Sequence, residues 1–390
     1  MNEKTLLFIP YQDTDNYFSD GILTREYAML YMLWSNGYKR VINIKKPRTW
    51  LDRKRYNVNV SFYPEGSVEA EVKRILDDAQ TLQYFPPFSL QQILRRRGWW
   101  KEGYLKTATM LPPVGEGCLV YSNNPFAAPL LRILSETGCR IYFDIMDNFA
   151  IHPSLNENEQ RQALEGYREI LSFADLISAN SLQSCDYMAQ FTKREIHLVK
   201  NGVFSETGIQ RIGDFPLLEQ ISKKVSKYRA CVGYVGKLGL RLDAELIETI
   251  SSACPDTLFV FIGDSLKGQI NEKLLSLFQE ENNVLHISAI PSAYVCAVCR
   301  QFDMLMIPHS VGQFENGGDP LKLYQYLSTG KPIITTPILG VDEFQDCICI
   351  ENDPQAWVRF LQQEHEAFQK YEIPGSIDWQ RRAAPILELL

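Results

Sequence analysis

A lysine at the start of a predicted helix stands out as a residue that could do chemistry. Lys322 lies in the stretch from Asp319 to Gly330, which reads as a short helix between a glycine-rich loop and an apolar strand. Asp319 is a good N-cap, Pro320 suits the first helical position, and Gly330 ends the helix. A cation in the first turn opposes the helix dipole at a cost of about 0.3–1 kcal/mol. The pattern indicates either a phosphate site, held by the ammonium and the free N–H groups, or a solvated lysine.

Two further cations follow another predicted strand. Lys237 and Arg241 come after the strand Cys231–Val235, in a loop that contains Gly236. Cations in a glycine-containing strand-to-helix loop suit a diphosphate, and a tight turn with surface charges is the alternative. The glycines are spaced three apart from Gly233 onward and do not form G-x-G-x-x-G. A dinucleotide-binding fold is therefore not indicated.

In the first half of the chain, polar residues follow the ends of predicted strands. Asp147 comes shortly after the strand Arg140–Asp144, and His152 lies five residues further on. Other polar residues, Asp20, Arg25 and Asn123, follow the first strand or a later one, Cys118–Tyr121. Since ligands of open α/β sheets bind at the carboxyl ends of strands, we expect these side chains to line one cleft.

A cluster of cations and tryptophans lies further from any strand. The residues are Arg95, Arg96, Arg97, Trp99, Trp100 and Lys101. This mixture suits an anionic bilayer surface or a lipid diphosphate acceptor. A solvated loop with the tryptophans packed into the core explains the cluster equally well.

Composition excludes several classes of protein. The chain has 390 residues, of which 45% are hydrophobic and 22% charged, so we expect a globular protein of two or three domains. Its net charge of −7 argues against bulk nucleic-acid binding. We expect a reduced cytoplasmic protein, because its nine cysteines are scattered and we find neither an apolar run that could span a bilayer nor a signal peptide. The inner face of the membrane is a further expected location. Cys296 and Cys299 form a C-x-x-C without further metal ligands and are read as helix packing.

Predicted strands and helices alternate along the whole chain. Apolar strands at Thr5–Pro10, Val41–Ile44 and Val58–Phe62 are separated by amphipathic helices, and Gln12–Gly21 reads as a polar loop. A second series of strands and helices begins near residue 210. We therefore expect an α/β protein with two doubly wound, mostly parallel sheets, whose ligands bind in the cleft between the two domains.

Several segments resemble GT-B glycosyltransferases, in particular members that build bacterial polysaccharides. Val232–Leu238 with Arg241 is similar to the opening of their nucleotide-binding domain, and Phe302–Pro308 to the strand before the donor loop. Asp319–Leu327 through Pro332 matches their donor-site helix, and Asp378–Ala383 resembles the terminal helix that crosses back onto the first domain. The resemblance implies Rossmann-like domains at 1–205, for the acceptor, and at 206–372, for the donor, with the crossover helix at 373–390.

The resemblance also implies a nucleotide-sugar substrate, UDP- or GDP-linked, with no metal and no other cofactor. Lys322, Lys237 and Arg241 would neutralise the leaving diphosphate. The donor side would also include Gly236, Gly318, Asp319, Leu321 and Gln325. Many relatives carry a glutamate where Gln325 stands and another where Gly317 stands. This departure removes the usual support for a retaining mechanism.

On the acceptor side, the resemblance favours Asp147 as general base, with His152 as the alternative. Asp144 is read as a structural residue, and Asp20, Arg25 and Asn123 as acceptor-side residues. The expected function is transfer of a sugar to a glycan or lipid-linked acceptor in cell-surface polysaccharide assembly. A nucleotide-sugar epimerase of the same fold and a non-catalytic sugar-binding protein are the alternatives.

Overall fold

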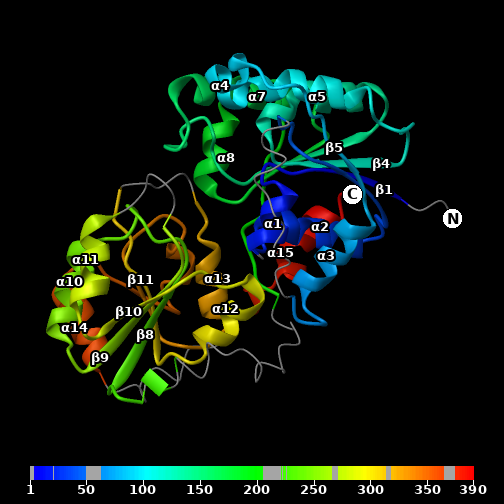
Figure 1. Cartoon of the computed structure of the whole chain (residues 1–390). Coiled ribbons are helices and arrows are strands. Elements are labelled where there is room, and N and C mark those ends of the chain that lie inside the picture. The colour runs from blue at the N-terminus through cyan, green and yellow to red at the C-terminus, as the bar shows by residue number, and fades with distance from the viewer. Residues whose placement is uncertain are drawn as a thin grey trace. The chain divides into compact units, whose positions relative to one another are not determined.

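The computed structural model describes residues 4–20, 22–49, 63–204, 221, 223–224, 226–265, 271–312, 318–363 and 374–390 (Figure 1). The chain forms two compact units. The first consists of Met1–Lys200, Asn316–Gly318 and Trp379–Leu390, and the second of Asn201–Glu315 and Asp319–Asp378. The sequence-based boundary was placed at 205/206, and the second unit here begins at Asn201.

A parallel sheet of seven strands forms the centre of the first unit, in the order β3-β2-β1-β4-β5-β6-β7. Its strands are β1 (Thr5–Ile9), β2 (Arg40–Ile44), β3 (Gln80–Leu82), β4 (Cys118–Ser122), β5 (Arg140–Ile145), β6 (Leu176–Ala179) and β7 (His197–Leu198). The order reverses between β1 and β4, as in a doubly wound sheet. The central strands are buried along nearly their whole length, which explains why they read as continuous apolar runs.

Helices cover both faces of this sheet. They are α1 (Thr14–Asp20), α2 (Arg25–Ser35), α3 (Val68–Asp78), α4 (Leu90–Arg95), the 3-10 helix η2 (Arg96–Trp99), α5 (Trp100–Ala108), η3 (Pro125–Ala127), α6 (Ala128–Glu136), α7 (Glu157–Phe173) and α8 (Leu182–Ala189). Figure 1 shows α4, α5 and α7 on one side of the sheet and α1, α2 and α3 on the other. Asn156 caps α7 through a reciprocal capping box with Glu159, as its position before an amphipathic segment predicts.

The second unit contains a parallel sheet of six strands in the order β10-β9-β8-β11-β12-β13. The strands are β8 (Ala230–Val235), β9 (Thr257–Ile262), β10 (Val284–Ile287), β11 (Met304–Ile307), β12 (Ile333–Thr335) and β13 (Cys349–Ile350). The helices are α10 (Ala244–Ala253), α11 (Glu272–Glu280), α12 (Ser292–Cys299), α13 (Leu321–Leu327), η5 (Asp342–Phe344), α14 (Pro354–Gln362) and η7 (Gly375–Ile377). Residues of α10, α11 and α14 share one apolar core, and residues of α12 and α13 share another. This unit is therefore also doubly wound.

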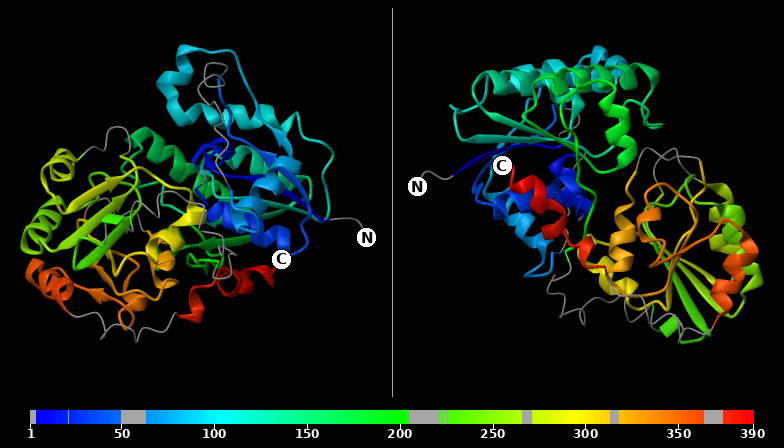
Figure 2. Two further views of the ribbon diagram at one scale, coloured as in Figure 1. Left: turned by 60° about the horizontal axis from the view of Figure 1, so that its bottom comes forward. Right: turned by 180° about the vertical axis from the view of Figure 1, so that it is seen from behind.

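The last helix, α15 (Trp379–Leu387), belongs to the first unit and packs against α2. Figure 2 shows this red helix beside the blue helices of the N-terminal part. Trp379 is only 2% exposed, and the Arg25 guanidinium lies 5.6 Å from the centre of its ring. The expected return of the C-terminal helix to the first domain is confirmed.

Two local expectations were wrong, and one lies outside the described residues. Gln12–Gly21 was expected to be a loop, but Thr14–Asp20 forms α1. Asp319 was expected to cap the donor helix, but α13 begins at Leu321 with Pro320 at the N-cap. The strand expected at Val58–Phe62 lies outside the described residues.

Candidate functional site

Lys322 lies in the first turn of α13 and faces the end of β8 in the second unit. Its Nζ donates a hydrogen bond to Tyr234 Oη at 2.5 Å and lies 3.3 Å from His309 Nε2. The ammonium is also 3.9 Å from the centre of the Tyr234 ring, close enough for a cation–π contact. The expectation that this lysine faces solvent is therefore wrong, because its stem and head are half-buried against Tyr234 and His309.

The electrostatic environment of Lys322 is unfavourable to its positive charge. Burial lowers its pKa well below the ordinary value, and the charges of Arg241 and Lys237 lower it further. No carboxylate forms an ion pair with Lys322 in the described part of the chain. The pKa of His309 is lowered in the same way, by burial and then by Lys322 and Arg241. Lys322 and Arg241 therefore repel each other, and neither makes an ion pair with a carboxylate among the described residues.

Gly236 allows the loop after β8 to pass close to this ammonium. Its φ of +152° is one that side-chain-bearing residues rarely adopt, and a Cβ built there would lie 2.5 Å from Lys322 Nζ. The Tyr234 hydroxyl donates to the Lys237 carbonyl at 3.0 Å, so the same tyrosine holds both the loop and the lysine. The backbone carbonyl of Arg241 accepts from Ser310 N at 2.8 Å, which ties the loop to the segment after β11.

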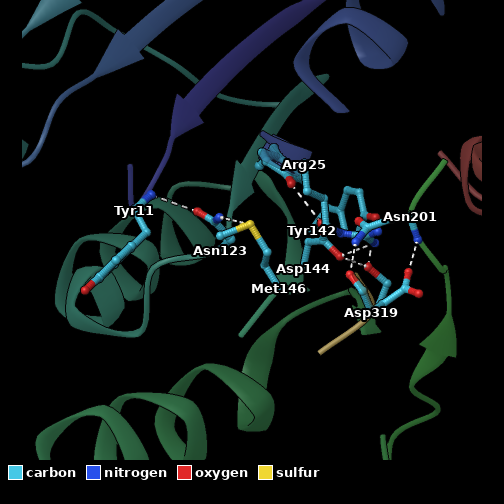
Figure 3. Close-up of polar contacts among 10 residues, drawn as sticks. Tyr11, Arg25, Asn123, Tyr142, Asp144, Met146, Asn201 and Asp319 are labelled. Atoms are coloured by element: carbon cyan, nitrogen blue, oxygen red, sulfur yellow. Dashed lines mark hydrogen bonds and ion pairs between the residues drawn. The ribbon is translucent and has the colours of Figure 1, made fainter. Parts of the chain in front are cut away.

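Asp319 is held by protein groups. One carboxylate oxygen accepts from Asn201 N at 2.5 Å, and the backbone carbonyl accepts from Asn201 Nδ2 at 2.7 Å (Figure 3). The other carboxylate oxygen accepts from Tyr324 Oη at 2.6 Å. Only 6% of the residue is exposed. The carboxylate therefore fixes the start of α13 onto the segment that opens the second unit, and this positioning role replaces the expected capping role.

The remaining donor-side candidates differ in exposure. Lys237 is exposed, whereas Arg241, Leu321 and Gln325 are half-buried. No described heavy atom lies within 4 Å of the position that a Cβ would take on Gly318. Arg241 makes no ion pair within the described ranges, so its charge is available to a ligand.

In the first unit, Arg25 and Asp144 form a buried ion pair. Arg25 Nε lies 2.8 Å from Asp144 Oδ2, and Nη2 lies 2.9 Å from Oδ1 (Figure 3). The hydroxyls of Tyr121 and Ser178 also donate to this carboxylate, at 2.8 and 2.6 Å. Burial lowers the pKa of Arg25, but Asp144 more than offsets this and raises it overall. Arg25, expected to line the cleft for the acceptor, instead connects α2 to β5 in the interior, because its bidentate partner is itself fully buried.

The side chain of Asn123 also contacts other parts of the first unit. Its Oδ1 accepts from Tyr11 N at 2.8 Å, and its Nδ2 lies 3.7 Å from Met146 Sδ, so it joins the loops that follow β1, β4 and β5 (Figure 3). Only 1% of Asn123 is exposed, so it supports these three loops from within. Asp20 ends α1, and its side chain lies outside the described residues.

Asp147 and His152 both lie on the loop after β5. Asp147 is half-buried, and its carbonyl accepts from Tyr167 Oη at 2.7 Å. Burial raises the pKa of Tyr11, Arg97 opposes this shift, and the charge of Asp147 adds to it. His152 Nδ1 accepts from Ser154 N at 3.2 Å and lies 2.8 Å from Ser154 Oγ.

Of the two readings of the cluster at Arg95–Lys101, the position of Trp100 fits the one in which the tryptophans pack into the core. Trp100 packs on the core and contacts Phe126, with 5.7 Å between ring centres. Arg97 pairs with the buried Glu159 at 2.8 Å. Trp100 and Arg97 therefore hold the fold together, since both contact interior residues.

Sequence reasoning missed the residues that surround Lys322 and Asp319. Tyr234 and His309 were hidden because each lies within or just after an apolar strand, where a core role is commoner. His309 follows the end of β11 by two residues, and a polar residue at that position could have been recognised. Asn201 is separated from Asp319 by 118 residues, so no local pattern indicates their contact.

Comparisons with known proteins were made for the sequence and for the fold. No family model matches the chain. In sequence, the chain is 24% identical to Bacillus subtilis (strain 168) TuaH, which is described as a candidate teichuronic acid biosynthesis glycosyltransferase. The match covers 59% of this chain and 58% of TuaH, so the chain spans less than two thirds of that relative.

Solved structures match nearly the whole chain. Anabaena Alr3699/HepE, in complex with UDP and glucose, has a TM-score of 0.62 at 15% identity and covers 99% of this chain and 98% of its own. Sucrose-phosphate synthase from Thermosynechococcus elongatus has a TM-score of 0.63 at 14% identity over 99% and 98%. An Escherichia coli structure titled with trehalose-6-phosphate and bound with UDP-2-fluoro glucose has a TM-score of 0.62 at 12% identity over 99% of both chains. With its two parallel Rossmann-like sheets, the chain has the GT-B fold found in these glycosyltransferase structures.

Proposed function

We propose that this protein is a glycosyltransferase that moves a sugar, a hexose in the first instance, from a UDP- or GDP-linked donor to a glycan or lipid-linked acceptor. The observation that carries the proposal is that Lys322 and Arg241, near the end of β8, repel each other and make no ion pair with a carboxylate among the described residues. TuaH, by its description, and HepE, by its bound UDP and glucose, support the donor class and a role in polysaccharide biosynthesis.

A diphosphate would supply an anion for Lys322 and Arg241. Two phosphates placed between Lys322 and Arg241 would relieve their mutual repulsion and raise the pKa of Lys322 toward its ordinary value. The same contacts strengthen as negative charge develops on the leaving nucleotide, so they favour the transition state over the bound donor. Tyr234 and His309 would keep the ammonium in position, because both lie within hydrogen-bond distance of Nζ.

On the acceptor side, we assign Asp147 as the general base. A sugar hydroxyl that attacks an anomeric carbon must lose its proton, and a carboxylate on the loop after β5 can accept it. Gln325 and Gly317 stand where many relatives carry glutamates. The absence of these glutamates favours an inverting mechanism with Asp147 as the general base, and His152 is the alternative base.

The test is turnover of a panel of UDP- and GDP-sugars, with and without a membrane extract as source of acceptor. A transferase releases nucleotide diphosphate only when acceptor is present. Conversion of the donor without acceptor would instead identify an epimerase. Binding of the donor without any conversion would identify a non-catalytic protein, which the missing glutamates would then explain.

A further inference from the structure

Helix α4 exposes an aliphatic face that the fold does not use. The reciprocal capping box of Ser89 and Gln92 fixes its start, and Leu90, Ile93 and Leu94 follow at the spacing of one helix face. These side chains are 72%, 60% and 79% exposed, and they are three of the four most exposed large apolar side chains among the described residues. We refer to these three residues as the α4 face.

The residues that follow α4 turn toward the interior. Arg96, with φ of +47°, is the only residue other than glycine with positive φ in the described part of the chain, and it ends α4 sharply. Immediately after it, Gly98 and Trp100 pack toward the core. The chain therefore anchors this segment through η2 and α5 and leaves α4 on the outer side of its helical layer, as Figures 1 and 2 show.

Cations surround the α4 face in a chain that is acidic as a whole. Between Ala79 and Gly115 the sequence carries five cations, Arg95, Arg96, Arg97, Lys101 and Lys106, and one carboxylate, Glu102, against a net charge of −7 for the protein. Neighbouring α7 adds Glu159, which Arg96 and Arg97 share, and Glu165, 3.4 Å from Lys101. Arg95 pairs with Glu102 at 2.7 Å. Even with these partners counted, positive charge exceeds negative.

We propose that the α4 face and its flanking cations bind the surface of an anionic lipid bilayer. An exposed helix face with aliphatic residues in the middle and arginines beside it can insert the former below the headgroups and place the latter among the phosphates. Exposed ion pairs such as Arg95–Glu102 are weak, so phosphates can compete for these arginines. No helix in the described residues could cross a bilayer, and binding at the surface does not require one. The inference does not depend on transferase activity.

Vesicle sedimentation of the full chain tests this surface. Wild type should bind phosphatidylcholine vesicles that contain phosphatidylglycerol, and binding should weaken with added salt and without the anionic lipid. The variant Leu90→Gln/Ile93→Gln/Leu94→Gln should lower binding at least tenfold while its melting temperature stays unchanged, because these side chains are exposed. Arg95→Gln/Arg96→Gln should lower binding and reduce its salt dependence, since Arg97, Lys101 and Lys106 remain. Leu182 on α8 is 62% exposed and lies outside the α4 face, so Leu182→Gln is the control for the leucine substitutions. The Leu182→Gln protein should bind vesicles as wild type does.

Three results would overturn the proposal. The first is that wild type does not bind anionic vesicles, and the second is that the triple variant binds them as wild type does. The third is a dimer in sedimentation equilibrium that the triple variant dissociates, which would show that a second copy of the chain covers the α4 face.

Discussion

Replacing Lys322 by methionine should weaken nucleotide diphosphate binding without weakening the fold. Methionine keeps most of the apolar stem and removes the ammonium. A charge-assisted hydrogen bond contributes about 1.5–3 kcal/mol, which corresponds to a loss of UDP or GDP affinity of about 10- to 100-fold. The folded state already disfavours the protonated lysine, as its lowered pKa shows, so we expect the free energy of unfolding to stay the same or rise.

The pKa of Lys322 adds a second, independent signature to this experiment. In the free protein this pKa is well below its ordinary value, and a bound diphosphate would raise it. Between the two values the complex holds one more proton than the free protein. Binding should therefore take up a proton, and affinity should fall as pH rises through that window.

Calorimetry in buffers of different ionisation enthalpy measures affinity and proton uptake together. Lys331→Met, a lysine just beyond the other end of α13, is the matched control and should behave as wild type. Unchanged UDP and GDP affinity in Lys322→Met would refute the site. Lost affinity accompanied by a large loss of stability would refute the reasoning that the protonated Lys322 does not stabilise the folded state.

Three further predictions address the acceptor side, the metal and the fold. Asp147→Asn should lower kcat by about 10²–10⁴-fold with donor KM little changed, and near-normal kcat in a folded variant would remove Asp147 as the base. Transfer activity should survive EDTA, because we propose that Lys322 and Arg241 neutralise the diphosphate, and the described residues contain no cluster of side chains that could hold a metal ion; complete loss that added Mg²⁺ or Mn²⁺ restores would contradict this. Arg25→Met should cost about 3–5 kcal/mol in urea unfolding, since it leaves the buried Asp144 without its cation. Arg132→Met, which breaks an exposed pair with Glu169, should cost under about 1 kcal/mol, and equal losses in the two variants would contradict the assigned difference.

Much of the fold could be predicted because its signals are local. Helix α7 carries both its capping box and an amphipathic pattern within the one segment Asn156–Phe173, so its start and its buried face can be read from neighbouring residues. The buried strands read as short apolar runs between turns, and their alternation with helices indicates parallel sheets. Helix α1 was missed because its polar residues show no apolar period.

The site could be predicted only in part, because its contacts connect distant segments. Lys322 attracted attention as a cation in a first turn, but the sequence does not show that Tyr234 holds it, since 88 residues separate the two. Asp319 was predicted to be an N-cap because aspartate is favoured just before a helix. In the structure its carboxylate instead accepts hydrogen bonds from Tyr324 and from the distant Asn201. Likewise, Arg25 and Asp144 could each be read as cleft or loop residues until the fold paired them across 119 positions.

A crystal structure of the protein with bound UDP tests the central claim most directly. Our account predicts that oxygens of the diphosphate lie within hydrogen-bond distance of Lys322 Nζ, with the Arg241 guanidinium turned toward the same group. A nucleotide bound elsewhere, with Lys322 still held only by Tyr234 and His309, would contradict it.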